Sequence, residues 1–393
     1  MSTTDLDTLI GWAGQLTEEE KTVRHTVRQF VDKKCMPLIG EDFELGRFRT
    51  ELIPDMAQIG LLGANLSGYG CAGISAVGYG LACMELERCD TGLRSFVSVQ
   101  TSLAMFSISK FGDEAQKSHY LPKMAEGKLI GCFGLTEPGH GSNPGGMATR
   151  ARRDGAGWRL NGSKLWITNA QIADLAIVWA REVKDDGQLG TIVGFIVDKD
   201  TPGFSAQEIH HKVSLRASYT GGLHLDEVYL PESARLPQGM GLQAPLQCLE
   251  AARFGVAFGV IGAARDCLER AIAYTLDRQQ FEVPLASKQL VQAKLADMAT
   301  RVVQASVLAL HYGRLKDKGQ LSTVQVSIFK RDCCRLALEC ARTARGLLGA
   351  NGITVEYGVI RHMVNLESTF TYEGTDEIHT LAIGRALTGL AAF

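Results

Sequence analysis

The spacing of apolar residues changes twice along this chain of 393 residues, and that change restricts the fold more than any other feature. From residue 17 to about 129 the spacing is that of amphipathic helices, and Thr17 with Glu20 predicts a capping box at the start of one of them. Between 129 and 231 the period falls to two, in short runs separated by turn clusters. From 239 onward it is helical again. The sequence therefore predicts helices, then strands, then helices.

This order predicts an α+β fold, because the length exceeds the roughly 250–300 residues at which one hydrophobic core usually stops growing. We expect an N-terminal helical domain over 1–130, a middle antiparallel β domain over 131–236 and a C-terminal four-helix bundle over 237–393. No long helical pattern interrupts the strands, which favours an antiparallel sheet over βαβ units. The long helices of the bundle are expected near 242–277, 285–316, 322–347 and 375–390.

Composition narrows the possible partners. Lys and Arg total 41 against 43 Asp and Glu, so the chain offers no general attraction to nucleic acid or to an anionic membrane. It has no run of 18 apolar residues, which predicts no membrane span, and its acidic start lacks a signal-peptide pattern. The ten cysteines form no C-x-x-C pair, which predicts buried free thiols in a reducing compartment. We therefore expect a cytoplasmic protein.

The densest motif is the glycine-rich stretch 133–146, which follows a predicted strand. Glycines let backbone N–H groups approach anionic oxygens, although such a stretch by itself is more typical of a plain turn. A Rossmann site would need a helix directly after the loop, whereas residues 148–160 alternate and contain a hairpin turn. Further on, the indole of Trp166 either packs against a flat ligand or fills the core of the β domain.

Four motifs occur in a fixed order along the chain. They are Leu135–Ser142 (LTEPGHGS), Trp166–Asn169 (WITN), Asp277–Phe281 (DRQQF) and Tyr372–Thr375 (YEGT). With them the chain resembles the acyl-CoA dehydrogenase family of flavoenzymes, from about residue 15 to the end. Within this family it is most similar to the glutaryl-CoA dehydrogenases, through residues 85–88, 94–95, 98–100, 361–362, 365–367 and 384–389. The resemblance implies a homotetramer that passes electrons to an electron-transfer flavoprotein.

The resemblance also implies FAD as cofactor. The residues it assigns to FAD are Phe133, Leu135, Thr136, Gly141, Ser142, Trp166, Ile167, Thr168, Arg278, Phe281, Gln289, Thr375 and Glu377. Among these, Arg278 and Gln289 fit positions that reach the cofactor across a subunit interface. No metal ligands are expected.

For the substrate, the resemblance implies Glu373 as the catalytic base. Removing a proton next to a thioester requires a carboxylate in a site dry enough to raise its pKa. The residues expected to contact an acyl-CoA are Arg94, Ser95, Ser98, Glu87, Ser142, Arg253, Tyr372 and Gly374. Arg94 is expected to bind a distal carboxylate with Glu87 holding it in place, since an Arg in an apolar pocket requires an anion. A purely structural Arg–Glu pair is the alternative.

The predicted reaction is FAD-dependent dehydrogenation of glutaryl-CoA with decarboxylation to crotonyl-CoA and CO2. Leu93 stands beside Arg94 where the family has an aromatic residue, so a related branched or aryl-bearing dicarboxylic acyl-CoA is an alternative substrate. A dehydrogenase that does not decarboxylate and a short-chain acyl-CoA dehydrogenase or oxidase are alternative enzymes. A flavin-binding scaffold without turnover is a fourth possibility, which an intact Glu373 disfavours.

Overall fold

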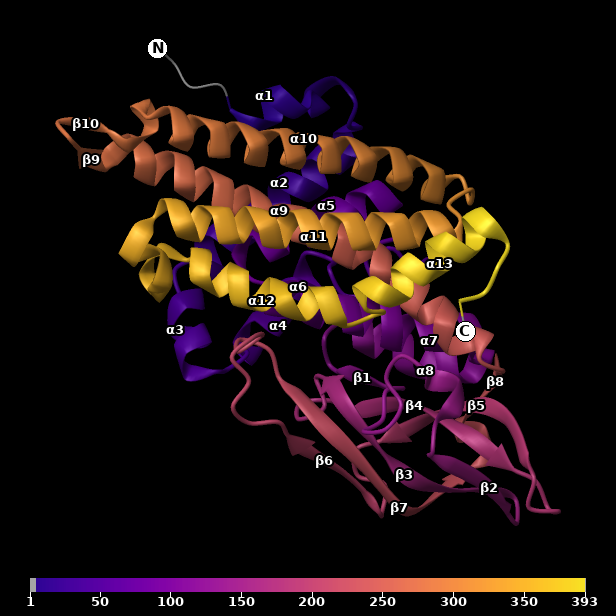
Figure 1. Cartoon of the computed structure of the whole chain (residues 1–393). Coiled ribbons are helices and arrows are strands. Elements are labelled where there is room, and N and C mark those ends of the chain that lie inside the picture. The colour runs from indigo at the N-terminus through magenta and orange to yellow at the C-terminus, as the bar shows by residue number, and fades with distance from the viewer. Residues whose placement is uncertain (1–4, 393) are drawn as a thin grey trace.

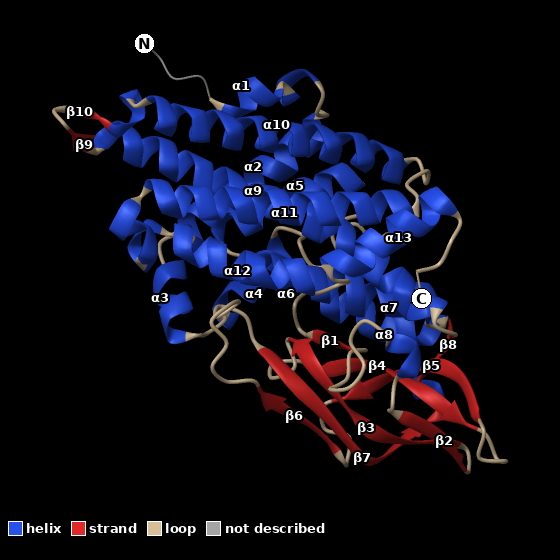
Figure 2. Ribbon diagram, viewed as in Figure 1, coloured by secondary structure: helices blue, strands red, loops and turns tan. Residues whose placement is uncertain are grey.

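The computed structural model describes residues 5–392 and separates helices from strands in space (Figures 1 and 2). Helices α1–α8 come first in the chain, strands β1–β8 form a sheet at one end of the molecule, and helices α9–α13 pack against the first set. The predicted α+β class and the order of helices, strands and helices are confirmed.

The N-terminal helices are short. They are α1 (Leu6–Ile10), α2 (Glu18–Phe30), α3 (Ile39–Leu45), α4 (Ile53–Gln58), α5 (Ala76–Cys89), α6 (Thr91–Ser98), α7 (Phe106–Phe111) and α8 (Glu114–Ala125). The capping box predicted at the start of α2 is present: the Glu20 amide donates to Thr17 Oγ1 at 3.2 Å, and the Thr17 amide donates to Glu20 Oε2 at 2.9 Å. A π-helical segment continues α6 directly into α7.

The sheet is mixed rather than purely antiparallel. Its strands are β1 (Gly131–Gly134), β2 (Arg150–Asp154), β3 (Gly157–Thr168), β4 (Leu175–Val183), β5 (Leu189–Asp198), β6 (Phe204–Glu208), β7 (Thr220–Pro231) and β8 (Arg235–Met240). Their order is β6-β7-β3-β2-β4-β5-β8, with β1 beside β4. Both β1 and β2 run parallel to β4, which the sequence did not predict. Strand β3 and its loops supply the long crossover that parallel pairing requires, so no helix marks it in the sequence.

Five helices follow the sheet: α9 (Gln243–Asp277), α10 (Gln289–Asp317), α11 (Thr323–Leu347), α12 (Val359–Thr371) and α13 (Asp376–Thr388). The strands β9 (Gln279–Gln280) and β10 (Val283–Pro284) form a small hairpin between the first two. Helix α9 is apolar enough over 18 residues to match a membrane span in composition, but 72% of that window is buried inside the fold, as in a core helix. The sequence missed α12 because its inward face carries polar residues such as His362 and Asn365.

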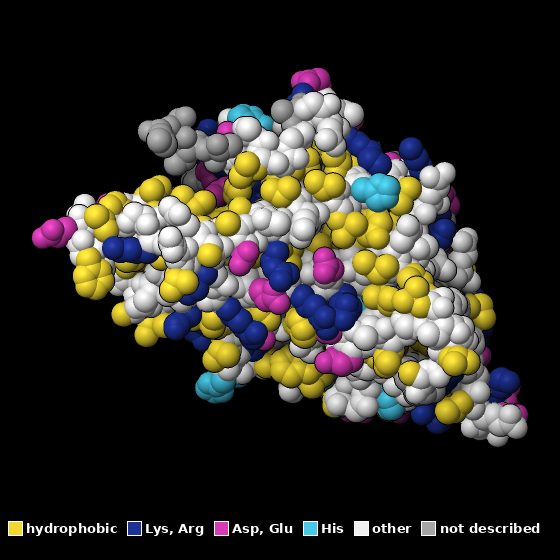
Figure 3. Space-filling view, turned by 45° about the horizontal axis from the view of Figure 1, so that its top comes forward, with side chains coloured by type: hydrophobic (Ala, Val, Ile, Leu, Met, Phe, Trp, Pro, Cys, Tyr) yellow, Lys and Arg dark blue, Asp and Glu magenta, His cyan; other side chains and the backbone are white. Residues whose placement is uncertain are grey.

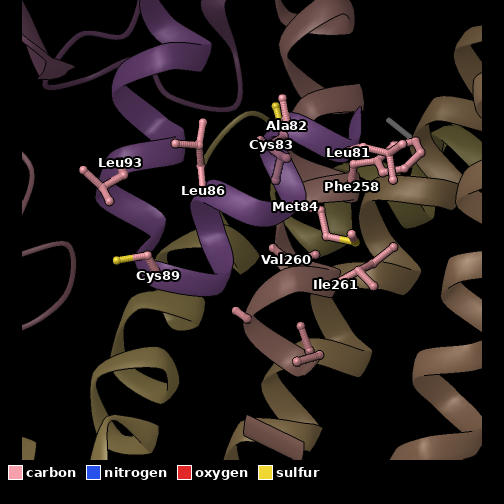
Figure 4. Close-up of a cluster of buried hydrophobic side chains, with 14 of the residues drawn as sticks. Leu81, Ala82, Cys83, Met84, Leu86, Cys89, Leu93, Phe258, Val260 and Ile261 are labelled. Carbon is pink, nitrogen blue, oxygen red and sulfur yellow. The ribbon is translucent and has the colours of Figure 1, made fainter. Parts of the chain in front are cut away.

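Helices α5 and α9 cross at close range in the centre of the helical region. Figure 4 shows Leu81 and Met84 of α5 gathered with Phe258 and Ile261 of α9, all fully or almost fully buried. A Cβ atom at Gly262 would overlap the backbone carbonyl oxygen of Met84. Glycine is therefore required at this position, because the two helix backbones are in direct contact.

A buried carboxylate joins three parts of the fold. Asp90 is the N-cap of α6, where its Oδ1 accepts from the Gly92 amide at 2.7 Å. Its Oδ2 accepts from Arg361 Nη1 and from Asn365 Nδ2 of α12, each at 2.8 Å. The Asn365 side-chain oxygen in turn accepts from the Leu215 amide at 2.7 Å, in the loop between β6 and β7. Asp90 thus fixes α6 to α12 and, through Asn365, to the sheet.

The surface carries charges of both signs. Figure 3 shows basic and acidic side chains side by side on one face, as the balanced composition predicts. All ten cysteines are free and nine of them are buried, which confirms the predicted burial of the thiols. Among residues 5–392, three large apolar side chains are more than three-quarters exposed in the single chain: Phe281, Leu290 and Leu387.

We predict that Asp90→Asn lowers the free energy of unfolding by about 3–5 kcal/mol, because it leaves the buried Arg361 guanidinium without its anion. Chemical denaturation measures the change. Glu367→Gln is the matched control: it removes a carboxylate from the exposed ion pair with Arg342 and should cost less than about 1 kcal/mol. Equal losses in the two variants would contradict the role given to Asp90.

Candidate active site

The turn between α12 and α13 presents the predicted base. Glu373 and Gly374 both have positive φ, +53° and +96°. Each carbonyl of the turn is held by a cation: Arg253 Nε donates to the Glu373 oxygen at 2.7 Å, and Lys330 Nζ donates to the Gly374 oxygen at 2.8 Å. A Cβ at position 374 would lie 2.8 Å from His379 Nε2, so only glycine fits. The sequence did not single out Lys330 or His379.

The carboxyl group of Glu373 meets the requirements for a base. Its Oε2 atom is buried and has no hydrogen-bond partner among the described residues. Burial raises the pKa of Glu373, and the nearby positive charges of Arg94, Arg253 and Lys330 oppose that rise without cancelling it. A carboxyl with a raised pKa and a free oxygen is suited to accept a proton from a bound ligand.

Arg94 lies in the interior beside this turn. The residue is 1% exposed and its Nε donates to Glu87 Oε2 at 2.6 Å, a carboxylate that is itself fully buried. Its Nη2 donates to the hydroxyl of Tyr372, the residue directly before Glu373. Burial works against the charged form, but Glu87 outweighs it and holds the pKa of Arg94 above its usual range. Arg94 is therefore a permanent cation close to Glu373.

The same region contains further polar atoms without partners in the described part of the chain. Ser95 and Ser98 of α6 are both buried, and Ser98 Oγ has no hydrogen-bond partner. One oxygen of the Glu87 carboxylate is also unpartnered. Buried polar atoms are normally hydrogen-bonded, so this group of unpartnered atoms indicates a place for a polar part of a ligand.

A second buried ion pair shapes the glycine-rich loop. Glu137 accepts from Lys164 Nζ at 2.8 Å and from the Thr149 amide at 2.9 Å. Burial alone would raise the pKa of Glu137, but Lys164 holds it at about 2. Burial lowers the pKa of Lys164 to about 8, against the attraction of Glu137. This ion pair was not predicted from the sequence, although Glu137 lies in the motif Leu135–Ser142 and Lys164 stands two residues before Trp166.

The part of the glycine-rich loop that follows Glu137 is largely exposed. A Cβ at Gly139 or Gly141 would have no atom within 4 Å, and Ser142 is exposed. Strand β3 runs beside the loop, where the Leu165 amide donates to the Thr136 carbonyl at 2.9 Å. The next residue, Trp166, has φ +64° and is 59% exposed, so it does not fill the core of the sheet.

This arrangement fits a flat aromatic ligand with anionic groups. The exposed indole of Trp166 offers a face for ring stacking, and the open glycines leave their backbone amides accessible. Of the other residues predicted to bind FAD here, Phe133, Leu135 and Ile167 are buried while Thr136 and Thr168 are half-buried. They line up along β1, the loop and β3.

Other predicted cofactor residues lie elsewhere. Thr375 caps α13 by accepting from the Ile378 amide at 3.2 Å, and Glu377 is exposed one turn into that helix. Arg278, Phe281 and Gln289 are exposed around the β9–β10 hairpin. Helix α9 has 35 residues, about 50 Å, and it separates this hairpin from the sheet (Figure 1). One chain alone does not bring these three residues to the loop.

Models of three acyl-CoA dehydrogenase domains match the chain. The N-terminal domain matches residues 17–128, the middle domain 132–228 and the C-terminal domain 239–388.

Individual relatives align along nearly the whole length. A crystal structure of a glutaryl-CoA dehydrogenase from Mycobacterium smegmatis in complex with FADH2 is 54% identical, covers 100% of both chains and superposes with a TM-score of 0.96. An acyl-CoA dehydrogenase of Bacillus subtilis is 36% identical, over 95% of this chain and 99% of its own. The structure of butyryl-CoA dehydrogenase from Megasphaera elsdenii is 33% identical, covers 95% of this chain and 99% of its own, and has a TM-score of 0.90.

Gly259 of α9 makes room for the buried pair. A Cβ there would overlap Glu87 Oε2 and lie 3.1 Å from Arg94 Cγ, so the carboxylate would have to leave its partner. We predict that Gly259→Ala lowers the free energy of unfolding by about 2–3 kcal/mol, despite the higher helix propensity of Ala. Gly255→Ala, one turn earlier, is the control, because its nearest contact would be at 3.3 Å. Denaturant titration compares the two variants. An unchanged free energy of unfolding in Gly259→Ala would show that the Glu87–Arg94 pair does not need the space left by Gly259.

Proposed function

The chain belongs to the acyl-CoA dehydrogenase family, and on that premise we propose that it oxidises and decarboxylates glutaryl-CoA, a dicarboxylic acyl-CoA, to crotonyl-CoA and CO2. The observation that carries this proposal is the buried cation of Arg94 beside the base Glu373. The 54% identity to a glutaryl-CoA dehydrogenase supports it.

FAD fits the residues along the glycine-rich loop and β3. Phe133, Thr136 and Ser142 would hold it together with the exposed Trp166 and the half-buried Thr168. Bound there, FAD would supply the acceptor for the hydride equivalent that leaves the β-carbon of the substrate. The protein's part is to bind and orient the thioester and to move the protons.

Glu373 performs the proton transfers. Its carboxylate accepts the proton from the carbon next to the thioester as the β-hydrogen leaves. The bond between the γ-carbon and the distal carboxylate then breaks, CO2 departs, and the electron pair of that bond joins the conjugated dienolate. Glu373 returns its proton to the terminal carbon, beside the hydroxyl of Tyr372. Atoms and charge balance when bound FAD accepts the β-hydrogen as a hydride equivalent.

Arg94 would select the substrate. Its guanidinium is the buried cation that a distal carboxylate can meet, and Ser98 Oγ adds an unpartnered polar atom on the same helix. Glu87 holds the guanidinium through Nε, so a carboxylate would have to bind through the remaining N–H groups. The planar fork of Arg permits two contacts at once.

A second candidate is dehydrogenation of a short-chain monocarboxylic acyl-CoA. Two nitrogens of Arg94 already have partners inside the chain, Glu87 and Tyr372, which is what a purely structural ion pair would show. The similarity to butyryl-CoA dehydrogenase favours the same possibility. Dehydrogenation of a dicarboxylic substrate without loss of CO2 is the third outcome that the assays below distinguish.

We also propose a homotetramer and an electron-transfer flavoprotein as acceptor. The exposed Phe281 and the neighbouring Arg278 and Gln289 lie far from the loop of their own chain, so another subunit would have to bring them to a cofactor. The indole of Trp166, 59% exposed, offers an accessible edge of the flavin site to a redox partner.

We predict that Glu373→Gln abolishes bleaching of the flavin by glutaryl-CoA while FAD stays bound, because the amide cannot accept the α-proton. In the parent enzyme the bleaching rate should fall as the pH drops toward the raised pKa of Glu373, since only the ionised carboxyl is a base. Anaerobic stopped-flow absorbance measures both effects. Glu367→Gln on α12 serves as the control, and bleaching retained in Glu373→Gln would assign the base to another group.

We predict that Arg94→Ala lowers kcat/KM for glutaryl-CoA at least about 100-fold more than for butyryl-CoA, because a charged contact is lost only with the diacid. Product mass and released CO2 are measured together. Equal losses on both substrates would favour the structural pair and the short-chain activity. If glutaryl-CoA bleaches the flavin but no CO2 is released, the enzyme is a dehydrogenase that does not decarboxylate its substrate.

A further inference from the structure

Lys330 of α11 is a buried cation beneath the turn that carries the base. The residue is 1% exposed, and its ammonium donates to the Gly374 carbonyl at 2.8 Å. We propose that Lys330 is a positioning residue that holds the Glu373–Gly374 turn in its left-handed form and keeps the Glu373 carboxyl ionised for proton abstraction. This inference rests on the proposed role of Glu373 as base.

The buried position of the Lys330 ammonium group is unfavourable unless its charge interacts with a nearby anion. Burying an ammonium group is strongly unfavourable, and an apolar side chain of similar size would avoid this desolvation penalty. Within the described residues no carboxylate oxygen lies within 4.0 Å of Lys330 Nζ. Asp376, the acidic residue at the start of α13, already pairs with Arg335 at 2.5 Å. Glu373 is the nearby carboxyl group that has no such partner.

The backbone of the turn also requires support. Two successive residues with positive φ, one of them not glycine, form a conformation that a chain adopts only when its surroundings fix it. Arg253 holds the first carbonyl from α9, and Lys330 holds the second from α11. The carboxyl of Glu373 is therefore aimed by cations on two different helices.

Titratable groups on three helices face Lys330, and among them Arg253 is a second cation near Glu373. Arg253 faces it from α9, Asp376 and His379 from α13, and Cys334 from its own helix. Burial lowers the pKa of His379 to about 3, so its ring is neutral near pH 7 and adds no charge. Burial also lowers the pKa of Lys330, while Cys334 and Glu373 favour its charged form.

Three substitutions separate the two parts of the proposal. Lys330→Gln keeps a donor for the Gly374 carbonyl and loses the charge, Lys330→Met loses both, and Lys330→Arg keeps both. In Lys330→Gln we expect the acidic limb of the bleaching rate to move up by about one pH unit, because a neighbouring cation no longer stabilises the carboxylate. In Lys330→Met the same shift should accompany a maximal rate lower by about 10- to 100-fold, since the base is misplaced.

Anaerobic flavin reduction is followed from about pH 5 to about pH 9, because a buried carboxyl with a raised pKa titrates in roughly this range. Lys330→Arg should restore the parent profile, and Arg342→Gln, an exposed cation on the same helix, should leave it unchanged. FAD content and melting temperature show that each variant is folded. A Lys330→Gln profile that superposes on the parent, with only a lower melting temperature, would reduce Lys330 to a structural residue and overturn the proposal.

The same series distinguishes this proposal from the proposed function. If the parent enzyme bleaches with butyryl-CoA and not with glutaryl-CoA, the substrate assignment fails, and the pH profiles on butyryl-CoA still decide the role of Lys330. If Glu373→Gln retains bleaching, the base is elsewhere and the role of Lys330 is overturned with it.

Discussion

The site depends on one electrostatic arrangement, a buried carboxyl surrounded by cations that do not neutralise it fully. Burial raises the pKa of Glu373, and Arg94, Arg253 and Lys330 limit that rise. None of these cations forms an ion pair with Glu373 in the described residues, so the carboxyl keeps a free oxygen. A direct salt bridge would lower the basicity of Glu373 and occupy the oxygen through which the proposed base would accept a proton.

The rest of the fold keeps these charges in place. Asp90 begins α6, which carries Arg94, and the same carboxylate binds Arg361 on α12, which leads into the Glu373 turn. Gly259 leaves the space in α9 that the ion pair of Arg94 occupies. Because buried contacts connect α6, α9 and α12, Glu373 and Arg94 are held in the same region of the fold.

Several features could be predicted because they depend on local spacing. The alternation between 129 and 231 predicted the strands, and the Thr17–Glu20 spacing predicted a cap that the structure shows. The parallel pairing of β1 and β2 with β4 could not be predicted this way, since it depends on a crossover made of strand rather than helix. Helix α12 was missed for a related reason, because its buried polar residues find partners on other elements and interrupt the apolar pattern.

The sequence by itself determined the class of the fold and, through four ordered motifs, the family and the residue expected to be the base. Only the tertiary structure decided what surrounds that base. Lys330, Arg253 and Arg94 stand 43, 120 and 279 residues before Glu373 in the chain, and their spacing carries no periodic signal. Electrostatic interaction depends on distance and burial in space, and both arise only when α6, α9, α11 and the turn pack together.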